Sequence, residues 1–277
     1  MSDNTEKNFK LIGDVNDYST ISVDGGGVLR LDGIIVTHTQ GINGSGVTVN
    51  HDGTFLMLSG EISNNTAMDF GGGVSNRGTF VMSGGVISKN SALTSGGGVS
   101  NGGIFSMSGG KISDNTAVYC NGGGVSNGGA FSMSGGEISG NTATNGYGGG
   151  VFIWDHFNLS GGEISGNTAY IGGGIFSCEC TGKLVMYDGK ISNNTALVHG
   201  GGVFNSLQNT FIILGGEIFN NNVNSSGGGI FNYGTLSICS CVIVNNTASV
   251  GGGVYSVGLW GSFTMSSGMI SGNCVFN

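Results

Sequence analysis

Three consecutive glycines followed by valine or isoleucine recur at intervals of 24 to 28 residues, and this repeat limits the possible folds more than any other feature. The triplets begin at Gly71, Gly96, Gly122, Gly148, Gly172, Gly200, Gly227 and Gly251, after a degenerate copy at Gly44. Each unit holds three short segments in which apolar and polar residues alternate, and this period of two predicts β-strands. A unit of this length has no room for an additional helix. The sequence therefore predicts an all-β fold, a single parallel β-helix (solenoid) of about nine to ten rungs with three short strands each.

The apolar positions of the repeat align in four columns, which we expect to stack into one continuous core. The columns run from Val47 to Val254, from Phe55 to Phe263, from Met57 to Met265 and from Ile62 to Ile270. A fifth column is asparagine at a turn: Asn65, Asn90, Asn115, Asn141, Asn167, Asn194, Asn221, Asn246 and Asn273. Asparagines repeated at one turn position can bond to their copies above and below, so we expect an asparagine ladder.

Composition excludes several other classes of protein. The chain has 59 glycines but no proline and no glycine at every third position, so it is not collagen-like. Its hydrophobic content of 38% is too high for a flexible glycine linker. The apolar runs, such as residues 211–214, are far shorter than the ~20 residues that span a bilayer. With a net charge of −8 and scattered basic residues, we expect no membrane insertion and no nucleic-acid partner.

The two ends differ from the repeats. We interpret residues 1–43 as an N-terminal cap with one degenerate rung, in which residues 29–35 form a worn half-coil, and residues 44–277 as the β-helix repeats. The first ten residues contain no apolar stretch of the kind found in signal peptides. The last rung is followed by no polar cap, which leads us to expect a truncated chain or an end-to-end contact with a partner.

The unit GGG[VI]-x-N-x-G-x-F-x-M-S-G-G-x-I-S-x-N-T-A resembles the repeats of adhesin-like, right-handed parallel β-helix proteins of the pectin-lyase-like superfamily. It is also similar to the GGA[IL] and FxxN repeats of chlamydial polymorphic outer-membrane proteins, with IxxN here in place of FxxN, as in residues 138–141. The resemblance covers the chain from Gly44 onward. It implies an extracellular or cell-surface location, although the signal peptide and outer-membrane barrel of that family are not seen in this sequence.

The turns between the first and second strands are the most irregular part of the repeat, and loops on a rigid scaffold commonly carry function. They are short in early rungs and richer in large and polar residues later, where they contain Trp154, Asp155, His156, Glu179 and Trp260. The outward residue after each first-strand Val or Ile also changes, from serine to an aromatic residue. These aromatic residues are Phe152, Phe176, Phe204, Phe231 and Tyr255. They predict either an exposed apolar stripe that binds a ligand or a satellite core covered by the enlarged turns.

Two glutamates raise an enzymatic alternative. Glu137 and Glu163 occupy the same position in adjacent rungs, ~5 Å apart, which is close to the ~5–5.5 Å carboxylate separation of retaining glycosidases. We favour a solvated charge ladder instead, because Lys111 and Lys190 flank the two glutamates and neutralise them. Asp155 and Glu179 are a second possible pair of acids.

Metal and cofactor sites are poorly supported by the sequence. Asp155, His156, Cys178 and Cys180 could meet across two rungs, but their spacing is not diagnostic of a metal site. The six cysteines form no CxxC pair, and the triplets lack the aspartate of calcium-binding GGxGxD repeats. A threonine column beside the ladder is too interrupted to favour ice binding. We therefore predict no metal and no cofactor.

Three hypotheses about function follow. The first is a non-enzymatic, adhesin-like surface β-solenoid that binds a glycan or protein ligand through the turns of its C-terminal half and the aromatic stripe. The second is a carbohydrate-active β-helix enzyme, either a polysaccharide lyase or a hydrolase. The third is a purely structural spacer, one segment of a longer surface protein.

Overall fold

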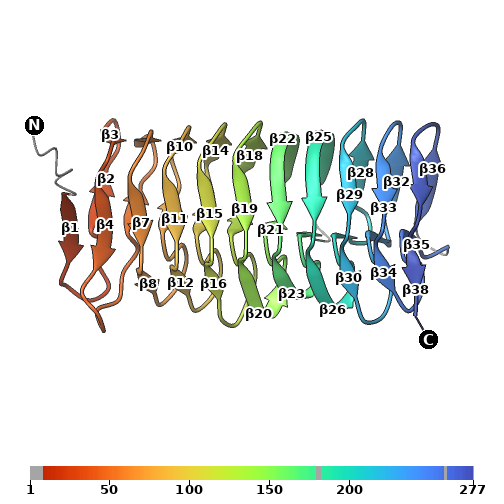
Figure 1. The fold of residues 1–277 in the computed structure, drawn as a ribbon. Helices are drawn as coiled ribbons and strands as arrows, with labels where there is room; N and C mark the ends of the chain where they lie inside the picture. Colours follow the sequence, from red (N-terminus) through yellow and green to blue (C-terminus); the bar gives the residue numbers. More distant parts are fainter. Residues whose placement is uncertain (1–8, 179–181, 259–260, 277) are drawn as a thin grey trace, which may run out of the picture.

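The computed structural model describes residues 9–178, 182–258 and 261–276. Throughout this part of the chain every regular element is a β-strand, and the strands wind into a right-handed parallel solenoid of about ten turns. Figure 1 shows the turns stacked in sequence order from one end of the molecule to the other. The predicted all-β solenoid is confirmed.

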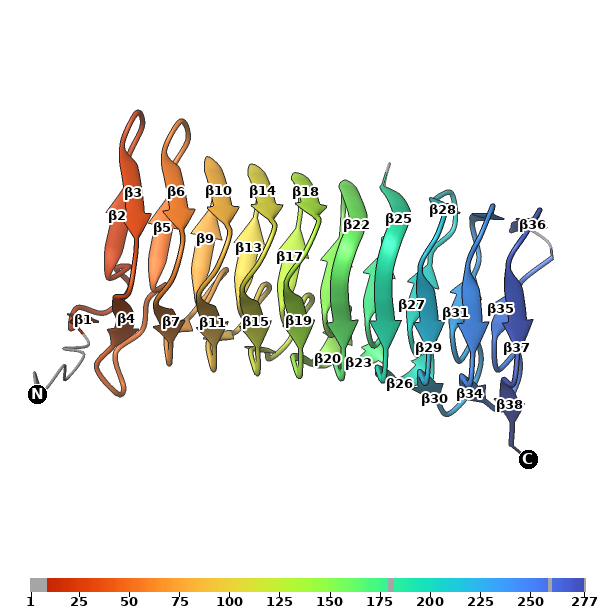
Figure 2. The same cartoon turned by 45° about the horizontal axis from the view of Figure 1, so that its top comes forward.

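The strands form three parallel sheets. The first-strand sheet contains β2 (Ile21–Val23), β5 (Val47–Val49), β9 (Val74–Asn76), β13 (Val99–Asn101), β17 (Val125–Asn127), β21 (Val151–Ile153), β24 (Ile175–Ser177), β27 (Val203–Asn205), β31 (Ile230–Asn232) and β35 (Val254–Ser256). Figure 2 shows the loops that connect these strands to the second strands along one edge of the solenoid, at the top of that view.

The largest sheet combines two rows of strands. The second-strand row contains β3 (Val28–Leu31), β6 (Thr54–Met57), β10 (Thr79–Met82), β14 (Ile104–Met107), β18 (Ala130–Met133), β22 (His156–Ser165), β25 (Lys183–Ser192), β28 (Thr210–Ile213), β32 (Thr235–Ile238) and β36 (Ser262–Met265). The third-strand row contains β1 (Lys10–Gly13), β4 (Ile35–His38), β7 (Glu61–Ser63), β11 (Val86–Ser88), β15 (Lys111–Ser113), β19 (Glu137–Ser139), β29 (Glu217–Phe219), β33 (Val242–Val244) and β37 (Met269–Ser271). The long strands β22 and β25 run through both rows and join them.

A third sheet follows the asparagine column. It contains β8 (Thr66–Ala67), β12 (Ser91–Ala92), β16 (Thr116–Ala117), β20 (Thr142–Tyr147), β23 (Thr168–Ile171), β26 (Thr195–His199), β30 (Asn222–Val223), β34 (Thr247–Ala248) and β38 (Cys274–Val275). From the asparagine column we expected a turn at this segment. It pairs as a strand because its backbone amides form hydrogen bonds to the adjacent coil. For example, the N–H of Ser91 donates to the Asn65 carbonyl at 2.8 Å.

Equivalent residues of successive turns lie opposite one another. Phe80 pairs with Phe55 on one side and with Phe105 on the other. The five phenylalanine rings from Phe55 to Phe157 stack with centroids 4.5 to 4.8 Å apart. The four predicted apolar columns are buried in one core, and burying each large side chain contributes ~1.5–3 kcal/mol. The last turn is the exception, because Phe263, Met265 and Ile270 are 40%, 37% and 39% exposed.

The predicted asparagine column forms a hydrogen-bonded ladder inside the corner after the third strand. Asn90 donates from its backbone N–H and from Nδ2 to the Oδ1 of Asn115, at 2.9 and 3.0 Å. The same Nδ2 also donates to the Ile62 carbonyl of the preceding turn at 2.8 Å. The pattern repeats from Asn65 to Asn273, so the buried amides satisfy one another and fix the register between turns.

A second, interrupted ladder was not predicted. Asn76 donates to Asn101 and Asn101 donates to Asn127, each at 2.7 Å, at the end of the first strand. Asn205 and Asn232 form a further pair at 2.8 Å. The Oδ1 atoms of Asn76 and Asn205 are buried without a hydrogen-bond partner, because the preceding turns place Val49 and Ser177 there instead of another asparagine.

The glycine triplets allow the turns to approach closely. Gly96 has a φ of +71°, a conformation that favours glycine. A Cβ on Gly97 would lie 2.6 Å from the Gly123 carbonyl oxygen of the next turn. No side chain fits between the stacked backbones at this corner, which explains why the triplet recurs.

The segment interpreted as a cap contains regular structure. Strands β2, β3 and β4 pair in register with β5, β6 and β7 of the first full repeat. The predicted half-coil at residues 29–35 thus belongs to a more complete turn. Strand β1 adds to the outer edge of β4.

Candidate functional site

The aromatic residues that follow the first-strand Val or Ile form a second row of stacked rings. Phe152, Phe176, Phe204 and Phe231 pair in register across β21, β24, β27 and β31. Their ring centroids are 5.4, 4.9 and 4.9 Å apart in successive turns. Tyr255 continues the row in a tilted arrangement, 5.2 Å from Phe231.

These rings are not an exposed stripe. Phe152, Phe176, Phe204 and Phe231 are only 1%, 8%, 7% and 1% exposed. Ile171, Cys178, Tyr233, Tyr255 and Val257 pack against them, and together they form a core separate from the main one. Of the two alternatives that the sequence left open, the exposed stripe is therefore wrong, and the structure contains the satellite core. The side chains that cover the rings belong to several coils of the solenoid. They come together only when the coils stack.

One part of the aromatic row opens to solvent in a hollow of about 330 Å³. Phe152, Phe176 and Phe204 line it, together with Tyr147 and Trp154. The Tyr147 ring stacks on Phe176 at 4.7 Å, and the Trp154 ring meets Phe152 edge-on at 5.1 Å. We call this site the aromatic hollow. Its two flanking rings are accessible, with Tyr147 38% and Trp154 44% exposed.

Few polar groups line the aromatic hollow. Asn121 accepts a hydrogen bond from the Tyr147 amide through Oδ1, at 3.2 Å, which positions the tyrosine. Ser206, which is buried, also lines the aromatic hollow. Trp154, Phe152, Phe176 and Phe204 were predicted from the sequence as candidate site residues, whereas Tyr147 was not. A partial signal was present, because Tyr147 directly precedes a glycine triplet, where the two preceding turns have Ser95 and Asn121, but Phe70 of an earlier turn is also aromatic at this position.

The other predicted turn residues lie apart from the aromatic hollow or outside the described residues. Asp155 and His156 form a solvent-accessible hydrogen bond with each other. Glu179, Cys180 and Trp260 lie outside the described residues. Among the residues that the structure describes, no group of three or more His, Cys, Asp or Glu side chains could hold a metal ion.

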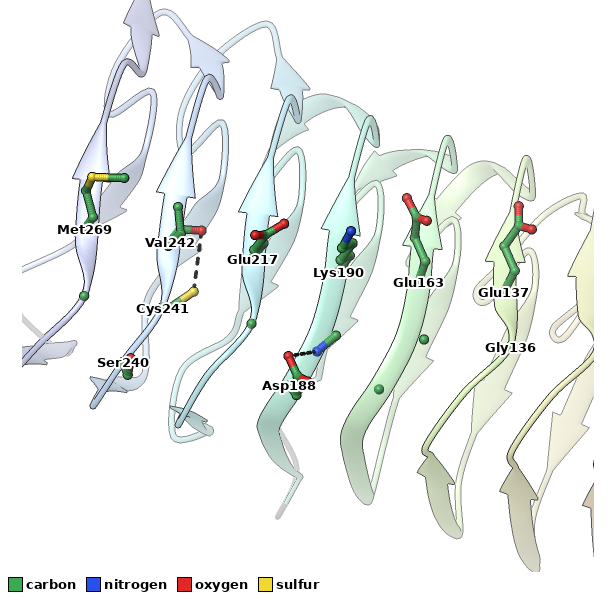
Figure 3. Close-up of a pocket in the computed structure, with 15 residues that line it drawn as sticks. Gly136, Glu137, Glu163, Asp188, Lys190, Glu217, Ser240, Cys241, Val242 and Met269 are labelled. Carbon is green, nitrogen blue, oxygen red and sulfur yellow. Dashed lines mark hydrogen bonds between the residues drawn. The ribbon is translucent and has the colours of Figure 1, made fainter.

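A row of charged side chains borders a second, larger concavity. The row contains Lys111, Glu137, Glu163, Lys190 and Glu217 in register along the third-strand row, and all but Lys111 line the concavity. Figure 3 shows four of these side chains, from Glu137 to Glu217, projecting in line from successive turns. The groove beside them measures about 870 Å³ and has several glycines in its lining, among them Gly162 and Gly189.

Each of the two adjacent glutamates has its own partner. Lys111 Nζ lies 3.0 Å from Glu137 Oε1. A hydrogen bond from Ser139 and this lysine keep the pKa of Glu137 below its usual value of 4.5, against the opposing effect of burial. Glu163 Oε1 instead accepts a hydrogen bond from the Ser192 hydroxyl at 2.7 Å. The row is thus a charge ladder in which Glu137 is stabilised as a carboxylate.

Comparisons with known proteins assign no family to the chain, and its fold class comes from the structure alone. Its geometry is that of a parallel β-solenoid repeat protein. No family model matches the sequence, no curated protein is significantly similar, and no solved structure matches the fold at a significant level. In the described ranges we find no helix with the length and apolar character needed to cross a bilayer.

Proposed function

We propose that this protein is a non-enzymatic, adhesin-like β-solenoid that binds a carbohydrate through the aromatic hollow. The observation that carries the proposal is the pair of accessible rings, Tyr147 and Trp154, which line one hollow with the buried phenylalanine rings that they contact. Small-ligand sites are concave and mostly apolar, with a few polar groups that orient the ligand. Tyrosine and tryptophan suit a sugar, because each offers an apolar face and a polar edge.

The size of the aromatic hollow favours a sugar over a protein partner. A stable protein interface uses ~20–30 residues on each side, whereas this site is at the lower end of the ~300–1,000 Å³ range of small-molecule pockets. One or two sugar rings are the ligand that matches this volume. The surface role rests on the resemblance of the repeats to those of adhesin-like proteins.

The electrostatics of the charged row give less support to the enzymatic alternative. A glycosidase needs one carboxylic acid whose pKa is raised, so that it can protonate the leaving group. The pKa of Glu137 is shifted in the opposite direction, by Ser139 first and then by Lys111. This shift suits a structural ion pair better than a general acid.

A glycan array tests the proposal. The wild-type protein should bind a limited set of glycans, and the Tyr147→Ala/Trp154→Ala double variant should lose this binding while keeping its β-sheet circular dichroism spectrum. Tyr119→Ala is a matched control, because Tyr119 is 65% exposed but does not line the aromatic hollow. The proposal is wrong if the wild type binds no glycan, or if the double variant binds as the wild type does. A folded wild type that binds no glycan would favour the spacer hypothesis.

A further inference from the structure

His38, at the end of β4, occupies the N-terminal end of the asparagine ladder. Its side chain is buried, with 6% of its surface exposed. Nδ1 lies 2.9 Å from Oδ1 of Asn65, which is the first asparagine of the ladder. Nε2 lies 3.0 Å from the backbone carbonyl oxygen of Tyr18, in the loop between β1 and β2.

The surrounding hydrogen bonds indicate that both ring nitrogens of His38 act as donors. Asn65 Nδ2 faces three oxygens, those of Val36, Ser63 and Asn90, at 3.4, 3.1 and 2.8 Å. The Asn65 Oδ1 atom therefore faces His38 and can only accept a hydrogen bond. The Tyr18 carbonyl is also an acceptor. A neutral imidazole has one N–H and satisfies one of these oxygens, whereas the imidazolium satisfies both.

Two glycines lie close to the His38 ring. A Cβ on Gly13 of β1 would lie 2.6 Å from the His38 ring, and a Cβ on Gly44 would lie 2.8 Å from Nε2. The Thr20 hydroxyl, 3.4 Å from Nδ1, donates its own proton to the Thr37 carbonyl. The absence of side chains at Gly13 and Gly44 thus leaves room for the imidazole.

No acidic group offers the ring a charge partner at close range. Within the described residues, no carboxylate forms an ion pair with His38 at 4.0 Å or less. Asp14 and Asp17 are in the adjoining loop, and Lys10 is in β1. The groups that face the two ring nitrogens are the neutral oxygens of Asn65, Tyr18 and Thr20.

We propose that His38 is a pH-responsive latch that holds the loop of residues 14–20 against the end of the asparagine ladder. In the imidazolium form it joins Asn65 to the Tyr18 carbonyl, and loss of one proton leaves one of these oxygens without a donor. The latch is closed while both ring nitrogens carry protons, which lower pH favours, and it opens when one of these protons is lost. This device is independent of the aromatic hollow.

Amide hydrogen exchange tests the latch. The N–H groups of Asp17 and Thr20 donate to the carbonyls of Asn43 and Ser45, so they report how firmly the loop is held. After correction for intrinsic exchange, their protection should rise about tenfold between pH 8 and pH 5, the effect of gaining one hydrogen bond. In His38→Asn, whose side chain stays neutral, it should not change with pH. Equal pH dependence in the two proteins would overturn the proposal.

A direct measurement on the wild type covers the case in which His38→Asn does not fold. In ¹⁵N-histidine NMR spectra, both ring nitrogens of His38 should be protonated and hydrogen-bonded at pH 5, and one should lose its proton by pH 8. His51, which has no hydrogen bond to its ring among the described residues, provides an internal comparison. A His38 ring that remains a single neutral tautomer from pH 5 to pH 8 would refute the latch.

Discussion

Asn115 donates two hydrogen bonds to one oxygen of Asn141, from its backbone N–H at 3.0 Å and from Nδ2 at 2.9 Å. Both residues are fully buried, and the sequence separates them by one repeat. The bond between these two side chains therefore links consecutive turns at a point that water does not reach. A buried donor without a partner costs ~1–3 kcal/mol, so the ladder makes each turn depend on the next.

Removing one step of the ladder should destabilise the protein. Asn141→Ala removes the acceptor of both bonds, so the Asn115 N–H loses its partner, whereas Nδ2 keeps its bond to the Ile87 carbonyl. We expect the free energy of unfolding to fall by about 2 kcal/mol. Urea denaturation monitored by circular dichroism measures the change. Asn158→Ala is the matched control, because Asn158 is exposed and its substitution should change stability by less than ~0.5 kcal/mol. Equal stability of Asn141→Ala and the control would contradict the account.

Extending the second ladder should recover a lost hydrogen bond. Val49 lies opposite Asn76, whose Oδ1 is buried without a partner. Val49→Asn offers that oxygen a donor, whereas Val49→Ala removes the same side-chain packing and offers none. We expect the asparagine variant to be about 1 kcal/mol more stable than the alanine variant in urea denaturation. An asparagine variant less stable than the alanine variant would show that the amide cannot adopt the ladder geometry here.

The ion pair between Lys111 and Glu137 should contribute modestly and only above acidic pH. The pKa of Glu137 is lowered in the folded protein, so its stabilising effect is present above the usual value of 4.5 and is lost as the pH falls through the lower folded value. Because both side chains are about 40% exposed, we expect a coupling energy below ~1 kcal/mol at pH 7. A double-mutant cycle with Lys111→Met and Glu137→Gln, measured at pH 7 and pH 3, tests this. A coupling that is unchanged at pH 3 would be inconsistent with the assigned pair.

The cysteines should differ sharply in reactivity. Burial raises the pKa of the Cys241 thiol to about 12, and its side chain is 3% exposed, whereas Cys239 and Cys274 are exposed. Because the thiolate is the reactive form, N-ethylmaleimide at pH 7.5 should modify Cys239 and Cys274 within minutes and Cys241 only after denaturation. Peptide mass spectrometry resolves the three sites. Labelling of native Cys241 at the rate of Cys239 would contradict its burial.

The architecture was predictable because the same alternation of apolar and polar residues recurs in every turn at a nearly constant interval. Alternation places Phe80 and Met82 on the same face, and the constant repeat length places Phe105 and Met107 beside them. Glycine at the corner and asparagine after Ile87 mark the places where stacked backbones approach and where buried amides need partners. These are local signals, and the structure contains each of them.

The site was predictable only in part, because it depends on contacts between turns. The outward direction of Phe176 followed from alternation, but its burial depends on Tyr147 and Ile171 of other strands. The lengths of β20 and β23, which bring these two side chains over the aromatic row, have no clear counterpart in the repeat pattern. The hydroxyl and carbonyl groups around His38 likewise come together only through the path of the N-terminal loop.

The affinity of the protein for its best array glycan, measured by isothermal titration calorimetry, tests the binding role of the aromatic hollow most directly. We predict that Trp154→Ala raises the dissociation constant at least tenfold, because the ligand loses one of the two accessible rings, Tyr147 and Trp154, that line the aromatic hollow. Tyr119→Ala should bind as tightly as the wild type. An unchanged affinity in folded Trp154→Ala would contradict the assignment of the aromatic hollow as the ligand site.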